Sequence, residues 1–207
     1  LKLVKKDLSS VKIVLSGVGA AGNAIARLLT LDGASNIIGF NHHGVIHNGM
    51  TSDDPMQQWF IDNSNPTNFT GKISEAIVGA DVFIGVSAPN VLTEADVAAM
   101  AKGSIVFALA NPDPEIDPVI ARKYATVVAT GRSDQPNQIN NVLAFPGIFR
   151  GLLDANAHKI SDQMLLAAAA AISDCVSPEQ LNTSFIVPSV FDANVVKAVA
   201  AAVKKSV

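Results

Sequence analysis

The chain has 207 residues, of which 49% are hydrophobic, 16% charged and 5% aromatic, and its formal net charge is −3. This apolar content excludes a disordered chain, and the length suits one large domain or at most two small ones. The slightly acidic balance, without a basic block, disfavours a nucleic-acid surface, and no apolar run approaches the roughly 18–20 residues that a membrane span needs.

The chain begins at Leu1 rather than at a methionine, and Leu1–Lys6 reads as the end of a helix already under way. No charged segment followed by an apolar stretch and a cleavage site is present, so no signal peptide is predicted. We therefore expect residues 1–207 to be a single domain and a fragment of a longer chain.

A strand, a turn, a helix and a second strand follow one another within about 30 residues. Lys12–Ser16 is a short apolar run, Ala20–Leu31 carries apolar residues at helical spacing, and Asn36–Phe40 is the next apolar run. Gly33 is a plausible stop for the helix. This order is typical of a βαβ unit.

Three more apolar runs, Asp81–Val86, Ser104–Ala110 and Ala125–Ala129, predict further strands. A capping box at Thr93–Asp96 and the pair Asp117-Pro118 predict short helices between them. Because the runs are continuously apolar rather than alternating, helices are expected on both faces of the sheet. The sequence thus predicts an α/β fold with a Rossmann-like, doubly wound parallel sheet.

The last third of the chain predicts helices rather than strands, at Pro146–Ala157, Ser161–Ala171 and Asp192–Lys205. The least regular stretch is Gly44–Gly71, which is rich in Asn, Asp, Ser, Thr and Pro. One helix at Pro55–Asp62 is the only element expected there.

Several reactive side chains have structural explanations. The single cysteine, Cys175, excludes an internal disulfide framework, suits a reducing, cytoplasmic compartment, and falls in an apolar helical setting that favours packing over nucleophilic chemistry. Capping and solvated-loop roles explain the acidic residues Asp113, Glu115 and Asp117. Arg132 either pairs with an anionic group or anchors its loop.

A glycine-rich turn, Gly17–Gly22, directly follows the first strand and opens the first helix. In such a turn the first glycine permits the tight bend, the second admits a pyrophosphate and the third allows close helix–strand packing. The free N–H groups and the positive end of the helix dipole then face the phosphates. The alternative is a tight turn without a ligand. The residues expected to bind the pyrophosphate of a dinucleotide are Gly17, Val18, Gly19, Ala20, Ala21 and Gly22.

Asn41, at the end of the second strand, stands where an acidic residue usually holds the ribose hydroxyls of the cofactor. Asparagine carries no charge to repel a 2′-phosphate, which weakens the preference for NAD. NAD is still expected, and NADP is left open. His42 and His43, if protonated, favour the extra phosphate; otherwise they are solvated loop residues. Together with His47 they could also be the ligands of a metal site. No cysteine or well-spaced carboxylate accompanies them, which favours the interpretation as loop residues.

Three loops follow predicted strand ends, where ligands collect in a parallel sheet. Ser87–Asn90 is expected to cover the adenosine side of the cofactor, and Asn111 to lie where the nicotinamide ribose meets the substrate. The third loop leads into Asn137–Asn141, whose amides suit a small carboxylate or hydroxy acid. Turn or cap chemistry is the alternative for each asparagine. The further cofactor-binding candidates are Asn41, His42, Ser87, Ala88, Pro89 and Asn111.

Five ordered motifs resemble the NAD(P)-binding domain of malic enzymes, most closely the shorter bacterial type. They are Gly17–Gly22, Ile84–Pro89, Val106–Pro112, Ala129–Ser133 and Asn137–Gly151, and Ile186–Asp192 matches as well. The resemblance implies oxidation of malate with NAD or NADP and decarboxylation to pyruvate with a divalent metal, Mg²⁺ or Mn²⁺. It also implies a homodimeric full-length enzyme, with malate or the nicotinamide end contacted by Asn111, Asn140 and Asn141.

In malic enzymes the catalytic tyrosine and lysine and the metal-binding carboxylates lie upstream of the position that matches Leu1. The resemblance therefore implies no catalytic residue and no metal ligand in this chain, which is expected to bind a dinucleotide but to be inactive alone. Two alternatives stay open. One is a malolactic enzyme, which converts malate to lactate with NAD retained, and the other is a non-catalytic NAD(P)-sensing module. The amides on the malate side argue against the sensing module.

Overall fold

The computed structural model describes residues 1–207, which divide into two compact units, Leu1–Pro136 and Asn137–Val207. The first unit contains one six-stranded sheet in the order β3-β2-β1-β4-β5-β6. The strands are β1 (Lys12–Ser16), β2 (Asn36–Asn41), β3 (Gly44–Val45), β4 (Val82–Gly85), β5 (Ile105–Ala108) and β6 (Val127–Thr130).

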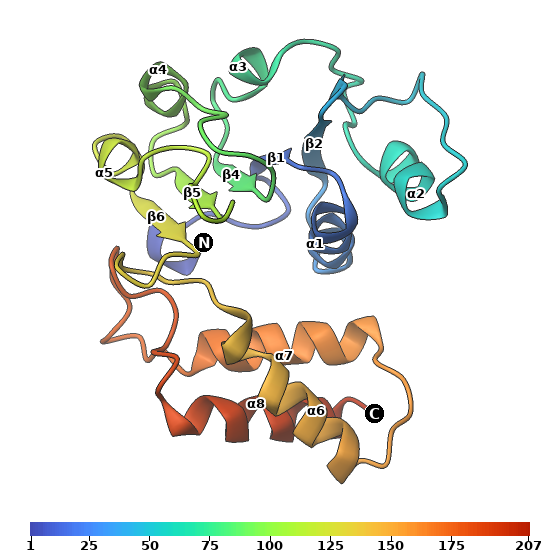
Figure 1. Ribbon diagram of the computed structural model, residues 1–207, viewed down its shortest axis with the longest axis vertical. Coiled ribbons are helices and arrows are strands. Elements are labelled where there is room, and N and C mark those ends of the chain that lie inside the picture. Colours follow the sequence, from blue (N-terminus) through green and yellow to red (C-terminus); the bar gives the residue numbers. More distant parts are fainter. The chain divides into compact units, whose positions relative to one another are not determined.

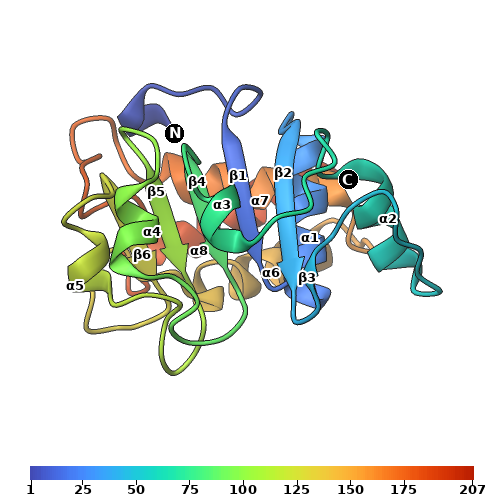
Figure 2. The ribbon, with the colours of Figure 1, turned by 90° about the horizontal axis from the view of Figure 1, so that it is seen from above.

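Helices cover both faces of this sheet, as the continuously apolar strands predict. α3, α4 and α5 lie on one face and α1 lies on the other, with α2 packed against α1 (Figures 1 and 2). The helical elements of this unit are the 3-10 turn η1 (Lys2–Val4), α1 (Ala20–Leu31), α2 (Pro55–Asn63), α3 (Ile73–Ala76), α4 (Glu94–Ala98) and α5 (Pro118–Ala121).

The predicted doubly wound sheet is confirmed, with one difference. Five strands are parallel, but β3 runs antiparallel to β2, to which it is joined by a tight hairpin. No strand was expected at Gly44–Val45, because two residues are too few to show a pattern. The expected helix end at Leu1–Lys6 is a single 3-10 turn that stops at Lys5, whose φ of 54° is left-handed.

The register of the central strands places their carboxyl ends side by side. Ser16, the last residue of β1, lies opposite Phe40 of β2 and Gly85 of β4. The loops that follow these three strands therefore open on one edge of the sheet. The chain leaves β1 toward β2 on one side and reaches β4 on the other, so this edge holds the topological switch point of the sheet.

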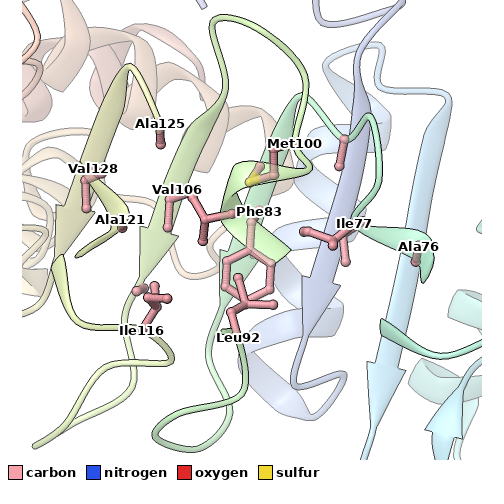
Figure 3. Close-up of a cluster of buried hydrophobic side chains, with 14 of the residues drawn as sticks. Ala76, Ile77, Phe83, Leu92, Met100, Val106, Ile116, Ala121, Ala125 and Val128 are labelled. Carbon is pink, nitrogen blue, oxygen red and sulfur yellow. The ribbon is translucent and has the colours of Figure 1, made fainter. Parts of the chain in front are cut away.

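The core between the sheet and α3–α5 is built from side chains of both layers. Phe83 of β4 is fully buried and lies in the middle of this cluster, between residues of the strands and of the covering helices (Figure 3). Val14 and Val106, also fully buried, come from the neighbouring strands on the same face. Burial of side chains of this size stabilises the unit by about 1.5–3 kcal/mol each.

The second unit consists of helices, as predicted. They are η2 (Asn141–Leu143), α6 (Phe145–Asp154), α7 (Asp162–Asp174) and α8 (Ala193–Lys205). α6 and α8 approach closely because α6 presents glycines to α8: a Cβ atom on Gly147 would lie 2.5 Å from Cβ of Val199, and one on Gly151 would lie 2.7 Å from the Ala200 carbonyl oxygen. The Ala-rich α7 packs against the same core.

Candidate functional site

A cleft of about 1060 Å³ opens at the carboxyl edge of the sheet in the first unit. Strand ends β1, β2 and β4, the first turn of α1 and the segments around α2 and α3 surround it. It is lined by Ser16, Gly17, Val18, Gly19, Ala20, Ala21, Asn23, Phe40, Asn41, His42, His43, Gly44, Asp54, Met56, Gln57, Gly71, Lys72, Ile73, Val86, Ser87, Ala88 and Val91. A cleft of this size, at the switch point, is large enough for a ligand larger than a single sugar or acid.

The turn between β1 and α1 is fixed by its glycines and by the neighbouring strands. Gly17 has a φ of 101°, and a Cβ atom there would lie 2.6 Å from the Val86 carbonyl oxygen, so only glycine fits. The Gly17 and Val18 N–H groups both donate to the Phe40 carbonyl oxygen, over 2.8 and 3.1 Å. The turn is therefore anchored between β2 and β4.

Two other glycines of the turn have opposite surroundings. Gly22 packs so tightly on the Gly17 carbonyl oxygen that no Cβ atom fits, which brings α1 close to β1. A Cβ atom on Gly19, in contrast, would meet nothing within 4 Å, and Gly19 lines the cleft. Space is thus open beside the backbone of Gly19, at the place where the sequence predicts a pyrophosphate.

The first turn of α1 leaves backbone donors free beside this open space. The first bond within the helix runs from the Asn23 N–H to the Gly19 carbonyl oxygen, over 2.9 Å. The N–H groups of Ala20 and Ala21 precede that bond and belong to residues that line the cleft. An unfilled cradle, free amides and the positive helix end fit a diphosphate.

Asn41 ends β2 at the cleft, as predicted, and its side-chain amide already has a hydrogen-bond partner within the protein. Its Oδ1 accepts a hydrogen bond from the His43 N–H over 2.8 Å, which closes the β2–β3 hairpin. Both amide N–H groups of Asn41 and the second lone pair of its Oδ1 are left for a ligand. His42 and His43 follow in the cleft wall, with ring centroids 3.7 Å apart. This end of the cleft contains donors and no carboxylate from β2.

One wall of the cleft comes from the stretch for which the sequence predicted least. Asp54 and Gln57 at α2, and Gly71 and Lys72 before α3, line the cleft although none was a candidate. The Asp54-Pro55 pair was the one local signal: the Asp54 carboxylate accepts from the Met56 N–H over 2.9 Å and caps α2. Lys72 shows no pattern that marks it in advance.

Asn65 holds this wall in place. It is fully buried, has a φ of 50°, and donates from Nδ2 to the carbonyl oxygens of Ile46 and Phe69 over 3.0 and 2.8 Å. Its Oδ1 accepts from the Phe69 N–H over 2.8 Å. The two bonds with Phe69 are local, but the bond to Ile46 joins residues 19 positions apart, and no local pattern predicts it.

The loop after β4 contributes two of its three predicted residues to the cleft. Ser87 and Ala88 line it, whereas Pro89 does not. The Ser87 hydroxyl lies 2.9 Å from that of Ser16, at the end of β1. Asn111, after β5, is exposed and lies outside the cleft lining.

The acidic stretch after Asn111 differs from the sequence interpretation at one position. Asp117 caps α5 through a 2.7 Å bond from the Val119 N–H, and Asp113 is exposed, as expected. Glu115 is instead fully buried. The solvated-loop interpretation is wrong for this residue, because backbone donors of two loops surround its carboxylate.

Asn140 and Asn141, the predicted substrate residues, begin η2 in the second unit. The Asn140 Oδ1 accepts from the Val142 N–H over 3.0 Å, so its amide caps this turn, and Asn141 is exposed. Nearby Asn137 is buried and structural: its Nδ2 donates to the Thr183 carbonyl oxygen and its Oδ1 accepts from the Ile186 N–H. That Asn111, Asn140 and Asn141 act on one substrate stays a prediction.

Other reactive side chains have local partners. The Arg132 guanidinium pairs with both carboxylate oxygens of Asp134 over 2.8 and 2.7 Å, and these bonds hold the pKa of Asp134 below its usual range. Partial burial, with Asp192 and Asp174 nearby, raises the pKa of the Cys175 thiol. No group of three or more His, Cys, Asp or Glu side chains is placed to hold a metal ion. None of the helices reaches the length and hydrophobicity of a bilayer span.

Comparison with known proteins gives matches along the whole chain. The family model described as malic enzyme, NAD binding domain, matches residues 1–207. A NAD-dependent malic enzyme of Geobacillus stearothermophilus is 54% identical over 98% of this chain and 42% of its own length. A bifunctional malic/malolactic enzyme of Bacillus subtilis is 47% identical over 100% of this chain and 51% of its own length.

Solved structures agree. The crystal structure of a NAD-dependent malic enzyme from Thermotoga maritima matches with a TM-score of 0.91 and 40% identity, over 98% of this chain and 54% of that one. The chain therefore spans about half the length of the relatives that it matches.

Proposed function

Because this chain belongs to the NAD-binding domain family of malic enzymes, we propose that it binds NAD or NADP for the oxidative decarboxylation of malate to pyruvate. The observation that carries the proposal is the cradle at the start of α1. There Gly19 faces open space while Gly17 and Gly22 are packed as tightly as backbone allows. This space lies in the cleft beside the N–H groups of Ala20 and Ala21 at the positive end of α1, and the combination fits a diphosphate.

Each half of the dinucleotide has its own set of residues in this proposal. The diphosphate accepts hydrogen bonds from the Ala20 and Ala21 N–H groups, where the helix dipole favours negative charge. The Asn41 amide donates to the ribose on the β2 side. The nicotinamide half then extends past Ser87 and Ala88 toward β5. We thus assign the loop after β4 to the nicotinamide half and not, as expected from the sequence, to the adenosine side, because β4 and β2 lie on opposite sides of β1.

The bound nicotinamide supplies the chemistry of hydride acceptance from C2 of malate. This chain's part is to bind and orient. The amides of Asn111, Asn140 and Asn141 donate to the carboxylates or the hydroxyl of malate without changing its charge. The turn and the loop after β4, which are fixed by hydrogen bonds within the protein, orient the cofactor so that its acceptor ring faces that substrate.

The residues of this chain do not fit a metal site. The malic enzymes that it matches are about twice as long. We place the general acid, the general base and the metal ligands in the part of such enzymes that this chain does not match. A homodimer of the full-length enzyme is part of the same proposal.

A malolactic activity is the second candidate, and the 47% identity to a bifunctional malic/malolactic enzyme favours keeping it. The two activities use the same dinucleotide site and differ in the product. Product analysis of the full-length enzyme separates them: pyruvate with reduced cofactor for the first, lactate without net reduction for the second.

Calorimetric titration of the purified chain with NAD and with NADP tests the proposal. We expect saturable binding of at least one dinucleotide, competed by ADP-ribose, and no malate-dependent cofactor reduction by the chain alone. Absence of binding would contradict the dinucleotide site. Robust turnover by residues 1–207 would contradict the assignment of the acid, base and metal ligands to another part.

A further inference from the structure

Glu115 is a buried carboxylate that the proposed function does not use. It lies between β5 and α5, and its side chain is fully buried. Its Oε1 accepts from the Ser87 N–H over 2.8 Å and from the Ser87 hydroxyl over 3.2 Å, while its Oε2 accepts from the Ala110 N–H over 3.1 Å. One carboxylate therefore joins the loop after β4 to the loop after β5.

The structure makes room for this carboxylate at the end of β4. A Cβ atom on Gly85 would overlap the carboxyl group of Glu115, so a glycine is required there. All of the named contacts bring a donor to a carboxylate oxygen, which is the arrangement that the ionised form requires. The salt bridges of the chain do not include Glu115, so its partners are neutral.

An ionised carboxylate without a cation is a costly group to bury. Neutral side chains can join two loops at a lower cost, so the charge itself calls for an explanation. Ser87, which Glu115 contacts, lines the cleft and bonds to Ser16 at the end of β1. Ser87 thus separates the negative charge of Glu115 from the cleft, on the β4 side of the cleft.

The strand order says which half of a dinucleotide faces this charge. With the diphosphate at α1 and the adenosine ribose at β2, the nicotinamide half lies on the opposite side of β1, beside β4 and β5. The oxidised nicotinamide ring carries one positive charge and the reduced ring carries none. A buried charge beside that ring is screened little by solvent, and so it acts differently on the two forms.

We propose that Glu115 is a positioning residue that fixes the two nicotinamide-side loops and selectively stabilises the oxidised, cationic form of the bound dinucleotide. The inference rests on the proposed function, because it needs a dinucleotide in the cleft. It goes beyond that function by assigning a buried charge without a cationic partner to the discrimination between NAD⁺ and NADH. In the direction of malate oxidation, such a charge favours binding of the substrate form of the cofactor over its product.

Calorimetric titrations with NAD⁺, NADH and ADP-ribose test the proposal on the wild-type chain and on Glu115→Gln. The variant removes the charge with little change of size. We expect the ratio of NAD⁺ to NADH affinity to fall at least about fivefold, as loss of a nearby, poorly screened charge implies. Asp113→Asn removes an equal charge from an exposed position of the same loop and should leave the ratio unchanged.

The readout separates charge from structure. A merely structural role would lower the affinities for NAD⁺ and NADH by the same factor, and that result would overturn the proposal. Absence of all dinucleotide binding by the wild type would instead contradict the proposed function.

A second test needs no variant and so does not depend on the folding of Glu115→Gln. Benzamide adenine dinucleotide has the shape of NAD⁺ but a neutral ring. We expect the wild-type chain to bind NAD⁺ at least about fivefold more tightly. Equal affinities would contradict the proposal.

Discussion

Gly22 of α1 lies directly on the carbonyl oxygen of Gly17, and this contact sets how closely the helix approaches the sheet. The same turn leaves the backbone of Gly19 open to the cleft. Two substitutions of equal size, one at each glycine, therefore separate the folding role of the turn from its binding role.

Gly19→Ala should lower dinucleotide affinity at least tenfold, about 1.4 kcal/mol, because its methyl group enters the space for the diphosphate. The free energy of unfolding should change little, since the φ of −107° at Gly19 suits alanine. Gly22→Ala should lower the free energy of unfolding by about 1–3 kcal/mol through overpacking. Urea unfolding and calorimetry measure both; a Gly19→Ala chain with unchanged affinity would contradict the assignment.

Asn41→Asp should make the chain selective against NADP. The new carboxylate accepts the same His43 N–H bond, so the hairpin is kept, but it adds a negative charge where the 2′-phosphate lies. We expect NADP affinity to fall at least tenfold and NAD affinity to change less than threefold, in side-by-side titrations. A parallel loss for both cofactors would show that Asn41 does not face the 2′ position.

Asn65→Ala should destabilise the first unit by about 2–4 kcal/mol. The buried carbonyl groups of Ile46 and Phe69 lose their hydrogen-bond donor, and alanine must adopt the left-handed φ of this position. Asn63→Ala is the matched control: Asn63 is exposed, and its change should stay within about 0.5 kcal/mol. Denaturant unfolding measures both. Equal effects would contradict the role given to Asn65.

Cys175 should react slowly with iodoacetamide. Burial and the nearby Asp192 and Asp174 raise the pKa of its thiol, so at about pH 8 its thiolate fraction is smaller than that of free cysteine. The alkylation rate should rise with pH through an inflection above that of N-acetylcysteine measured alongside. A rate at or above that of the small thiol would indicate a reactive cysteine instead.

Much of the sheet was predictable because its signals are local. The continuous apolar runs and the glycine turn predict β1, α1 and β2 to within one residue, and the observed bounds of α1 are Ala20–Leu31 as expected. A packed glycine turn needs its specific residues next to one another in the chain. The binding candidates around Gly17–Gly22 therefore lie in the cleft, apart from Gly22, which packs beneath it.

The rest lacks a local signal or depends on contacts between distant residues. β3 pairs with the adjacent β2 through two residues only, too few to show a pattern, and the wall that carries Lys72 is held by the bond from Asn65 to Ile46, 19 residues away in sequence. Glu115 lies in a polar, proline-rich stretch that is typical of an exposed loop, yet in the fold it is buried between the loop after β4 and the loop after β5. Composition and spacing do not contain that information, because burial here arises from tertiary packing.

Amide proton–nitrogen correlation spectra of the isotopically labelled chain, recorded during titration with NAD, test the central claim most directly. If the diphosphate lies at the start of α1, the largest shifts belong to Gly19, Ala20, Ala21 and Gly22, they saturate with the calorimetric affinity, and ADP-ribose reproduces them. If the amide signals of those four residues keep their chemical shifts while NAD saturates the chain, or if the largest shift changes belong to another region, the dinucleotide does not bind at this turn.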